Sequence, residues 1–222
     1  SDDRTPEIIN QFPVRVVVES VRGRGVARNR ACHECRTEFI AFTDADCVVS
    51  PDWLKSVMPV FKDNKVGAAG GDIVTPGDEV LARFFELRQI VSNREFSGDY
   101  PYSPPFLATA NAIFRLESII QAGGFSSKFR VAEDADISWR IAQKGYSIEY
   151  QPGATVFHHH RSTVLGLFHQ AIDYGHDGVH VYLHHFPETN GWFWWGLYYR
   201  LCLAILLLPF SLFGGSKLNK SF

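Results

Sequence analysis

The stretch Phe39-Ile40-Ala41-Phe42-Thr43-Asp44-Ala45-Asp46 decides how this chain is interpreted, because an apolar run ends directly in two carboxylates. A short apolar run of this kind is typical of a buried strand. In open α/β sheets, ligands bind at the carboxyl ends of the strands. Two carboxylates at such an end suit a hard divalent cation, Mg²⁺ or Mn²⁺, which in turn holds substrate phosphates. Since Asp-x-Asp is also common in turns, this interpretation depends on the rest of the chain.

Strands and helices alternate on both sides of this run. The β-branched stretch 14–18 is typical of a strand, and residues 26–36 are typical of a helix. Ser50 and Pro51 suit the N-cap and first position of a helix that runs to about residue 61. The other expected elements are strands at 66–71, 106–114, 146–150 and 154–157, helices at 81–92, 116–122, 133–144 and 162–174, and a polar loop at 93–105. This alternation predicts an α/β fold with a mainly parallel mixed sheet and flanking helices.

The composition is that of a folded chain without affinity for nucleic acid. The 222 residues are 45% hydrophobic and 21% charged, which is enough for a sizeable core. With 22 basic and 24 acidic side chains, no basic excess indicates nucleic-acid binding. We expect one domain over residues 1–180 and a separate hydrophobic tail over residues 181–222.

The tail contains an apolar stretch, residues 192–213, with a single charge, Arg200, and a single proline, Pro209. As a helix it would match the roughly 30 Å hydrocarbon core of a bilayer. Aromatic residues gather at one end of it, as in interfacial belts, and lysines follow the other end. We expect this hydrophobic helix to associate with a membrane, and spanning and interfacial placements both remain open. A buried amphipathic helix of the domain is the alternative.

Cys32 and Cys35 have the C-x-x-C spacing of redox and zinc sites. No second C-x-x-C exists in the sequence, so a closed zinc site would need distant histidines. Both residues also fall on the expected helix 26–36, where positions three apart share a face whatever their chemistry. We therefore interpret them as helix-face residues.

A second acidic constellation, Glu133-Asp134-Ala135-Asp136, opens the expected helix 133–144. Three carboxylates so close repel one another unless a cation or a proton is shared, although the helix dipole favours them at this end. Gly123 and Gly124 precede them and suit a loop that approaches a ligand closely. An aspartate here can take a proton from an acceptor hydroxyl, as a general base does. Acidic residues also occupy first turns for purely structural reasons.

Two weaker patterns complete the set. His158-His159-His160-Arg161 follows an expected strand, so that alternate histidines face opposite sides. One imidazole can complete a metal site, and Arg161 can meet a phosphate. The turn 23–25, Gly-Arg-Gly, opens a helix and can offer backbone N–H groups to phosphate. A plain strand-to-helix turn explains that glycine pair equally well.

Taken in order, these motifs resemble family 2 of the inverting glycosyltransferases. The motifs are Gly-x-Gly-x-Ala-Arg-Asn (23–29), Phe-Thr-Asp-Ala-Asp (42–46), Pro-Asp-Trp-Leu (51–54), Gly-Gly-Phe (123–125), Glu-Asp-x-Asp (133–136) and Pro-x₅-His (152–158). Each is weak alone, but together they follow family order and spacing over residues 1 to about 174. The resemblance implies the Rossmann-like glycosyltransferase A fold of the nucleotide-diphospho-sugar transferases.

The resemblance also implies an activity. It is the transfer of a sugar from a nucleoside diphosphate sugar to a hydroxyl of a glycan, lipid or other acceptor, with inversion and with Mg²⁺ or Mn²⁺ as cofactor. By position, the resemblance implies Asp134 as catalytic base with Glu133 beside it; Asp44, Asp46 and His158 at the metal; Arg28, Asn29, Asp44, Ala45, Asp46 and Arg161 at the donor; and Gly123, Gly124, Phe125, Asn111 and Asp136 at the acceptor and donor-sugar loop.

The chain departs from the family at its start. The family begins with a strand, followed by a segment whose aspartate recognises the base, and Ser1-Asp2-Asp3-Arg4-Thr5 resembles the end of that segment. We therefore expect the chain to be the larger C-terminal part of an enzyme, with an incomplete nucleotide pocket of its own. The parent enzyme would be membrane-associated and concerned with cell-envelope polysaccharide. Its catalytic domain would face the cytoplasm, where nucleotide sugars are made.

Two other classes remain open. A metal-dependent nucleotidyltransferase would also place carboxylates at strand ends, but it would release pyrophosphate instead of a nucleoside diphosphate. A non-catalytic binding or assembly module could keep the fold without the reaction.

Overall fold

The computed structural model describes residues 4–77, 93–94, 105–159 and 164–188. The chain divides into two compact units, Ser1–Val181 and Tyr182–Phe222. The expected helix 81–92, most of the expected loop 93–105 and the apolar stretch 192–213 lie outside the described residues.

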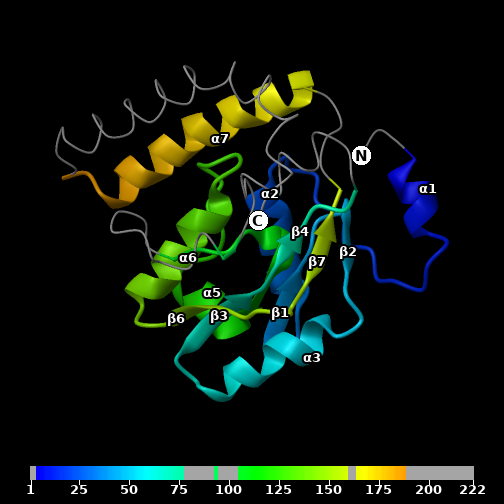
Figure 1. The fold of residues 1–222 in the computed structure, drawn as a ribbon, viewed down its shortest axis with the longest axis horizontal. Coiled ribbons are helices and arrows are strands. Elements are labelled where there is room, and N and C mark those ends of the chain that lie inside the picture. The colour runs from blue at the N-terminus through cyan, green and yellow to red at the C-terminus, as the bar shows by residue number, and fades with distance from the viewer. Residues whose placement is uncertain (1–3, 78–92, 95–104, 160–163, 189–222) are drawn as a thin grey trace, which may run out of the picture. The chain divides into compact units, whose positions relative to one another are not determined.

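A four-stranded sheet forms the centre of the first unit (Figure 1). Its strands, in spatial order, are β1 (Phe39–Phe42), β5 (Ala112–Arg115), β3 (Val66–Gly70) and β6 (Ser147–Tyr150). β1, β3 and β6 run in one direction, but β5 runs antiparallel to both of its neighbours. The sheet is therefore mixed, as expected. Only its β3–β6 ladder is parallel, which corrects the expectation of a mainly parallel sheet.

β5 is reversed because it starts at the carboxyl edge of the sheet. Ala112, its first residue, pairs with Phe42, the last residue of β1. A crossover connection after β3 would have returned the chain to the opposite edge and made β5 parallel. β5 is also shorter than the expected strand 106–114, because residues Thr109–Asn111 form a 3₁₀ turn, η2.

A second sheet of three strands carries part of the candidate site. Its order is β2 (Cys47–Val49), β7 (Val156–His158) and β4 (Ile73–Val74). β2 and β4 are too short for a sequence pattern to reveal. β2 runs antiparallel to β7, with Cys47 opposite His158, so the Asp-x-Asp run and the histidine segment become neighbours.

The helices of the described residues are α1 (Thr5–Ile9), α2 (Arg24–Glu34), α3 (Trp53–Val57), η1 (Met58–Lys62), α5 (Leu116–Gln121), α6 (Glu133–Gln143) and α7 (Val164–His185). The predictions of α2, α5 and α6 are confirmed to within two residues. The expected helix 51–61 divides into α3 and η1, since Pro59 lacks the N–H group that an α-helix requires. The expected cap is wrong, because Asp52 is the N-cap and the Ser50 carbonyl accepts from Trp53 N–H at 3.0 Å.

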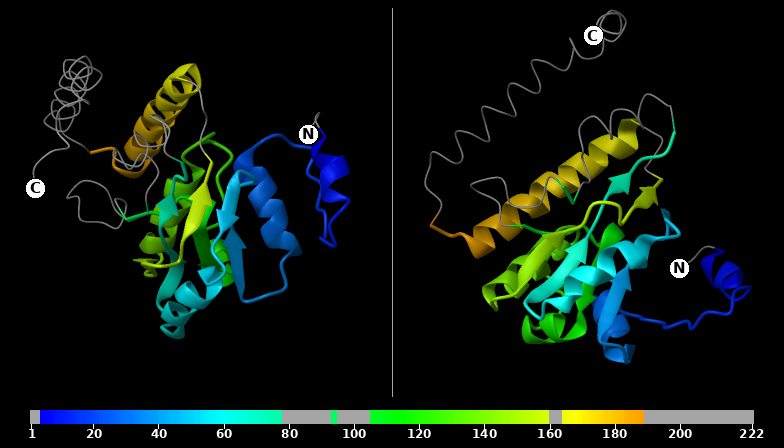
Figure 2. Two further views of the ribbon diagram at one scale, coloured as in Figure 1. Left: turned by 45° about the vertical axis from the view of Figure 1, so that its right-hand side comes forward. Right: turned by 60° about the horizontal axis from the view of Figure 1, so that its bottom comes forward.

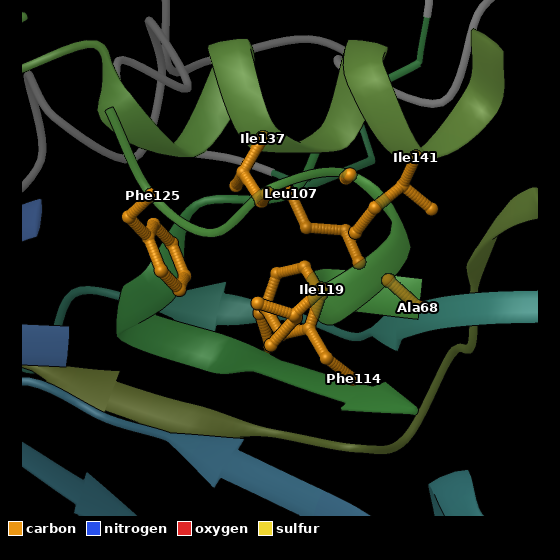
Figure 3. Close-up of a cluster of buried hydrophobic side chains, with 9 residues drawn as sticks. Ala68, Leu107, Phe114, Ile119, Phe125, Ile137 and Ile141 are labelled. Carbon is orange, nitrogen blue, oxygen red and sulfur yellow. The ribbon is translucent and has the colours of Figure 1, made fainter. Parts of the chain in front are cut away.

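Two apolar clusters pack on opposite faces of the four-stranded sheet. Ala112 and Phe114 of β5 point to one face and Ile113 to the other, as the alternation of a strand requires. Figure 3 shows Ile137 and Ile141 pointing from α6 toward the first face. Trp53, Val57 and Phe61 of α3 and η1 cover the second face. Each fully buried side chain of this size contributes roughly 1.5–3 kcal/mol, so the ends of β1 and α6 are held on a firm scaffold.

The expected strand 14–18 is not formed. Its valines are exposed, Val18 by 80%, and Figure 2 shows this segment apart from both sheets. A β-branched stretch becomes a strand only where a neighbouring strand pairs with its N–H and C=O groups. No described residue offers it such a ladder.

α7 runs to His185, beyond the expected end near residue 174. Within the described part of the chain, no helix combines the length and apolarity needed to cross a membrane.

Candidate active site

The Asp-x-Asp run forms a tight turn between β1 and β2. Cys47 N–H donates to the Asp44 carbonyl at 3.1 Å, and His159 N–H donates to the Asp46 carbonyl at 2.9 Å. These bonds leave both carboxylates outside the turn, where the side chain of Asp44 is 43% exposed and that of Asp46 is 56% exposed. The sequence interpretation of this run as polar groups at a strand end is thus reproduced in the fold.

His158 lies beside Asp46. Its Nε2 atom is 3.2 Å from Asp46 Oδ1, and its side chain is only 10% exposed. Cys47 joins them, because one ligand atom from each of Asp46, Cys47 and His158 lies within 4.8 Å of the others. Burial, with smaller effects from Asp44 and Asp46, raises the pKa of the Cys47 thiol to about 11. Carboxylate oxygen and imidazole nitrogen suit a divalent cation, so these residues fit the metal that the sequence predicts.

Arg28 connects the two acidic constellations. Its Nη2 atom is 3.5 Å from Asp44 Oδ1, and its Nη1 atom forms an ion pair with Glu133 Oε1. Glu133 is 1% exposed, and among the described residues its Oε2 atom has no hydrogen-bond partner. The guanidinium also lies over the Phe125 ring, 5.8 Å from its centroid. Arg28 thereby holds the end of β1 next to the start of α6.

Asn29, one residue further along α2, fixes the glycine loop. Its Oδ1 atom accepts from Phe125 N–H at 2.7 Å, and its Nδ2 donates to the Phe125 carbonyl at 2.8 Å. Gly124 has φ +77°, and a Cβ atom there would come within 2.8 Å of Asn29 Oδ1. The loop that includes Gly123, Gly124 and Phe125 is therefore tied to α2 by two hydrogen bonds and requires glycine at its closest approach.

Asp134, in the first turn of α6, has an environment that favours its neutral form. Burial, followed by the negative charge of Glu133, raises the pKa of Asp134 to about 7. Arg28 and hydrogen bonds to the backbone of Ala135 and Thr109 oppose this rise. A carboxyl group that titrates near neutral pH can serve as a general base.

Two cavities lie at the Asp-x-Asp run. The larger has a volume of about 410 Å³ and is lined by Arg24, Arg28, Asp44, Ala45 and Asp46. The second, of about 110 Å³, shares Arg24, Asp44 and Asp46 with the first, and is further lined by Val131, His158, Gln170, Asp173 and Tyr174. Together they fall in the size range of small-molecule sites.

α7 contributes three residues to the second cavity that sequence reasoning missed: Gln170, Asp173 and Tyr174. Burial raises the pKa of Tyr174, and the charges of Asp134 and Asp44 also act on it. Its position between the two acidic constellations is set by tertiary packing. No motif in the sequence marks it.

Asp177 anchors α7 to the loop before α6. Its Oδ2 atom accepts from Arg130 N–H at 2.7 Å and from Val131 N–H at 3.0 Å, and its Oδ1 atom is 2.8 Å from His176 Nδ1. Although burial opposes it, these hydrogen bonds hold the pKa of Asp177 below its usual value. The same contacts fix the chain immediately before Asp134.

Five predicted site residues line these cavities, namely Arg28, Asp44, Ala45, Asp46 and His158, and the other described ones are not among the lining residues. Asn111 is fully buried, accepts from Trp53 Nε1 and donates to the carbonyls of Asp72 and Ala154, so it joins the two sheets. Asp136 is 2% exposed and pairs with Arg140, which also donates to the Ala122 carbonyl before the glycine loop. Both have structural contacts within the protein, and their expected ligand contacts stay predictions. Arg161 lies outside the described residues.

Comparison with solved structures shows that the fold is known. A mannosyltransferase, PcManGT from Pyrobaculum calidifontis, solved in complex with GDP-Man and Mn²⁺, has a similar fold. Its TM-score is 0.62 at 22% identity, over 86% of this chain and 53% of that protein. This likeness supports the mixed α/β architecture with flanking helices.

Two curated relatives are similar in sequence. The pre-mycofactocin glycosyltransferase of Mycobacterium tuberculosis is 28% identical over 172 residues, 76% of this chain and 37% of the relative. The poly-beta-1,6-N-acetyl-D-glucosamine synthase of Staphylococcus aureus is 25% identical over 203 residues, 85% of this chain and 48% of the relative. This chain thus spans less than half the length of either relative. The family model described as Glycosyl transferase family 2 matches residues 1–123, more than half of the sequence, and the chain belongs to that family.

Proposed function

We propose that the protein containing this chain transfers a sugar from a nucleoside diphosphate sugar to an acceptor hydroxyl, with inversion and with a divalent cation. One observation carries the proposal. Arg28 pairs with both Asp44 and Glu133, so the carboxylates that follow β1 and the acidic start of α6 lie beside one guanidinium group. The names of the curated relatives, a glycosyltransferase and a poly-N-acetylglucosamine synthase, support the same class of reaction.

At the donor end, Asp46 and His158 would hold the cation, with Asp44 beside them. The cation would offset the negative charge that the diphosphate gains as the glycosidic bond breaks. Mn²⁺ is the first cation to test, since the mannosyltransferase of similar fold was solved with it. Arg28 adds a fixed positive charge between this end and Glu133.

At the acceptor end, Asp134 would act as the base. Inversion requires attack from the face of the sugar opposite to the departing diphosphate, and the base must lie on that face. A pKa of about 7 leaves much of Asp134 ionised at neutral pH yet basic enough to accept a proton from a hydroxyl in the transition state. Gly123, Gly124 and Phe125, held by Asn29, would border the acceptor and donor sugar.

The test separates these two ends in the full-length protein. Calorimetry with UDP, GDP and dTDP, with and without Mn²⁺, identifies the nucleotide, and release of nucleoside diphosphate from the matching sugar donor measures turnover. Asp134→Asn should reduce kcat by about 10²–10⁴-fold while the donor Kd changes less than about twofold. Asp46→Ala should abolish the Mn²⁺-dependent part of nucleotide binding.

Asp52→Asn is the matched control, because Asp52 is an exposed carboxylate away from the cavities. It should leave both kcat and Kd unchanged. Lost donor binding in Asp134→Asn would contradict its role as base. Release of pyrophosphate would indicate a nucleotidyltransferase, and cation-independent binding without turnover would indicate a binding module.

We further propose that residues 181–222 attach the protein to a membrane, with the catalytic domain on the cytoplasmic side. The apolar stretch 192–213, with Arg200 as its single charge, supports this proposal.

A further inference from the structure

A thiol lies in the candidate cation site. Cys47 on β2 pairs with His158 on β7, and side chains of directly paired residues project from the same face of a sheet. Cys47 is also next to Asp46 in the chain, so both groups assigned to the cation are its direct neighbours. Cys47 belongs to no motif in the sequence.

The ligand atoms converge. Asp46 Oδ1 is 3.2 Å from His158 Nε2 and 3.9 Å from Cys47 Sγ, and one ligand atom of each residue lies within 4.8 Å of the other two. The three residues thus offer one oxygen, one nitrogen and one sulfur around a common point. Asp46 is exposed, which leaves the open side to water or to a diphosphate.

This donor set determines which cations are favoured. Mg²⁺ prefers oxygen ligands in a strict octahedron, whereas thiolate favours softer and borderline cations, and affinity for mixed sites rises from Mn²⁺ through Co²⁺ toward Zn²⁺. Three protein ligands plus one open position is also the arrangement of non-structural zinc sites. We infer that Cys47 is a third ligand of this site and that it selects Zn²⁺, Co²⁺ or Cd²⁺ over Mg²⁺.

The inference rests on the cation site of the proposed function. It also predicts that cation binding releases a proton and that soft cations compete with Mn²⁺. Binding through sulfur converts the thiol to a thiolate, and the proton passes to the buffer, so one proton is released for each cation bound. A soft cation held by Cys47 occupies Asp46 and His158 as well. Zn²⁺ and Cd²⁺ therefore compete with Mn²⁺ for the same two residues.

The test measures binding, independently of turnover. A parent variant carrying Cys35→Ser and Cys202→Ser leaves Cys32 and Cys47, which pack against the two apolar clusters, and of these two only Cys47 has Asp46 and His158 within 4.8 Å. Titration with Cd²⁺ should produce the ultraviolet charge-transfer absorption of a cadmium–thiolate bond at one equivalent. Calorimetry in buffers of different ionisation enthalpy should show one proton released with Zn²⁺ and none with Mg²⁺.

Adding Cys47→Ser to the parent should abolish the absorption and weaken Zn²⁺ binding at least about tenfold, with Mg²⁺ affinity unchanged within about twofold. His158→Gln should weaken Zn²⁺ binding but retain the sulfur absorption at high Cd²⁺. Circular dichroism verifies that each variant is folded, and the absorption of the parent tests the inference even if Cys47→Ser does not fold. If the absorption is absent, or if it survives Cys47→Ser, while Mn²⁺ still binds, then Cys47 is not a ligand. The cation site of Asp46 and His158 is unaffected by that result. No binding of any cation overturns the proposed cation site as well.

Discussion

At the scale of single residues, Asp134 should make the activity depend on pH. Burial is the larger cause that raises its pKa to about 7, and the charge of Glu133 is the second. The charge of Arg28 lowers this pKa, and Asp134 and Asp44 both act on the nearby Tyr174. As the base must be ionised, kcat/KM should rise through about pH 7 and level off above it. Glu133→Gln removes the like charge but keeps Arg28, so the midpoint should move to lower pH. A pH–rate profile of both proteins measures this, and an unmoved midpoint would disprove the coupling.

The same shift predicts how stability depends on pH. The folded-state pKa of Asp134, about 7, lies above the reference value of 3.8, so the folded protein holds the proton more tightly. The free energy of unfolding should therefore fall between about pH 4 and pH 7 from this group. Asp134→Asn removes the cost of the charge and should be more stable than the parent by about 1–3 kcal/mol at pH 8. Urea unfolding should find the two proteins alike below pH 4, and a destabilised variant at pH 8 would contradict the burial of the charge.

At the residue scale, positions were predictable where the pattern is local. Asp44 and Asp46 follow β1 and Asp134 lies in the first turn of α6, as expected, and their roles at the site stay predictions. Asn111 could not be assigned, since whether an amide meets a ligand or a backbone carbonyl depends on tertiary packing. Cys47 was missed because a single cysteine in a strand of three residues carries no spacing signal.

At the scale of elements, α7 should control the position of the loop before α6. Asp177 is 8% exposed and accepts two backbone N–H groups from that loop. Asp177→Ala would leave both donors unsatisfied, which should cost about 1–3 kcal/mol of stability and reduce kcat more than donor affinity. Asp173→Asn is the control for stability, because its ion pair with Arg130 is exposed and should contribute less than about 1 kcal/mol. Urea unfolding compares the two variants, and kcat and donor binding are measured for Asp177→Ala. Equal losses of stability in the two variants would contradict the anchoring role.

Elements with their own hydrophobic pattern were predictable, namely β1, β3, α2, α5 and α6. The prediction failed for segments that become strands only when a neighbouring strand pairs with them. Residues 14–18 have the composition of a strand but no described ladder to join, and β2 and β4 form only because β7 lies between them. Pro59 could have warned that helix 51–61 would divide, since a proline within a helix removes a hydrogen bond.

On the scale of the whole molecule, the candidate site is assembled from distant segments. The end of β1, the start of α6, the end of β7 and the middle of α7 all contribute to the two cavities or to the ion pairs beside them. The first three segments carry sequence motifs, and the sequence alone predicted that they belong to one site. The contribution of α7 could not, because a helix face is chosen by what it packs against.

The apolar stretch 192–213 leads to the last prediction, which concerns where the whole molecule resides. If this stretch enters a bilayer, the full chain should float with liposomes in a density gradient. Leu206→Asp combined with Leu207→Asp should abolish flotation, because each acidic group costs about 2.5–3.5 kcal/mol in the hydrocarbon core. Val18→Asp, at a position that is 80% exposed, is the matched control and should float like the parent. Alkaline extraction then separates a spanning segment, which stays with the lipid, from an interfacial one, which is released. Flotation that survives the double substitution would assign membrane binding to another part of the chain, and no flotation of the parent would remove the membrane from the proposal altogether.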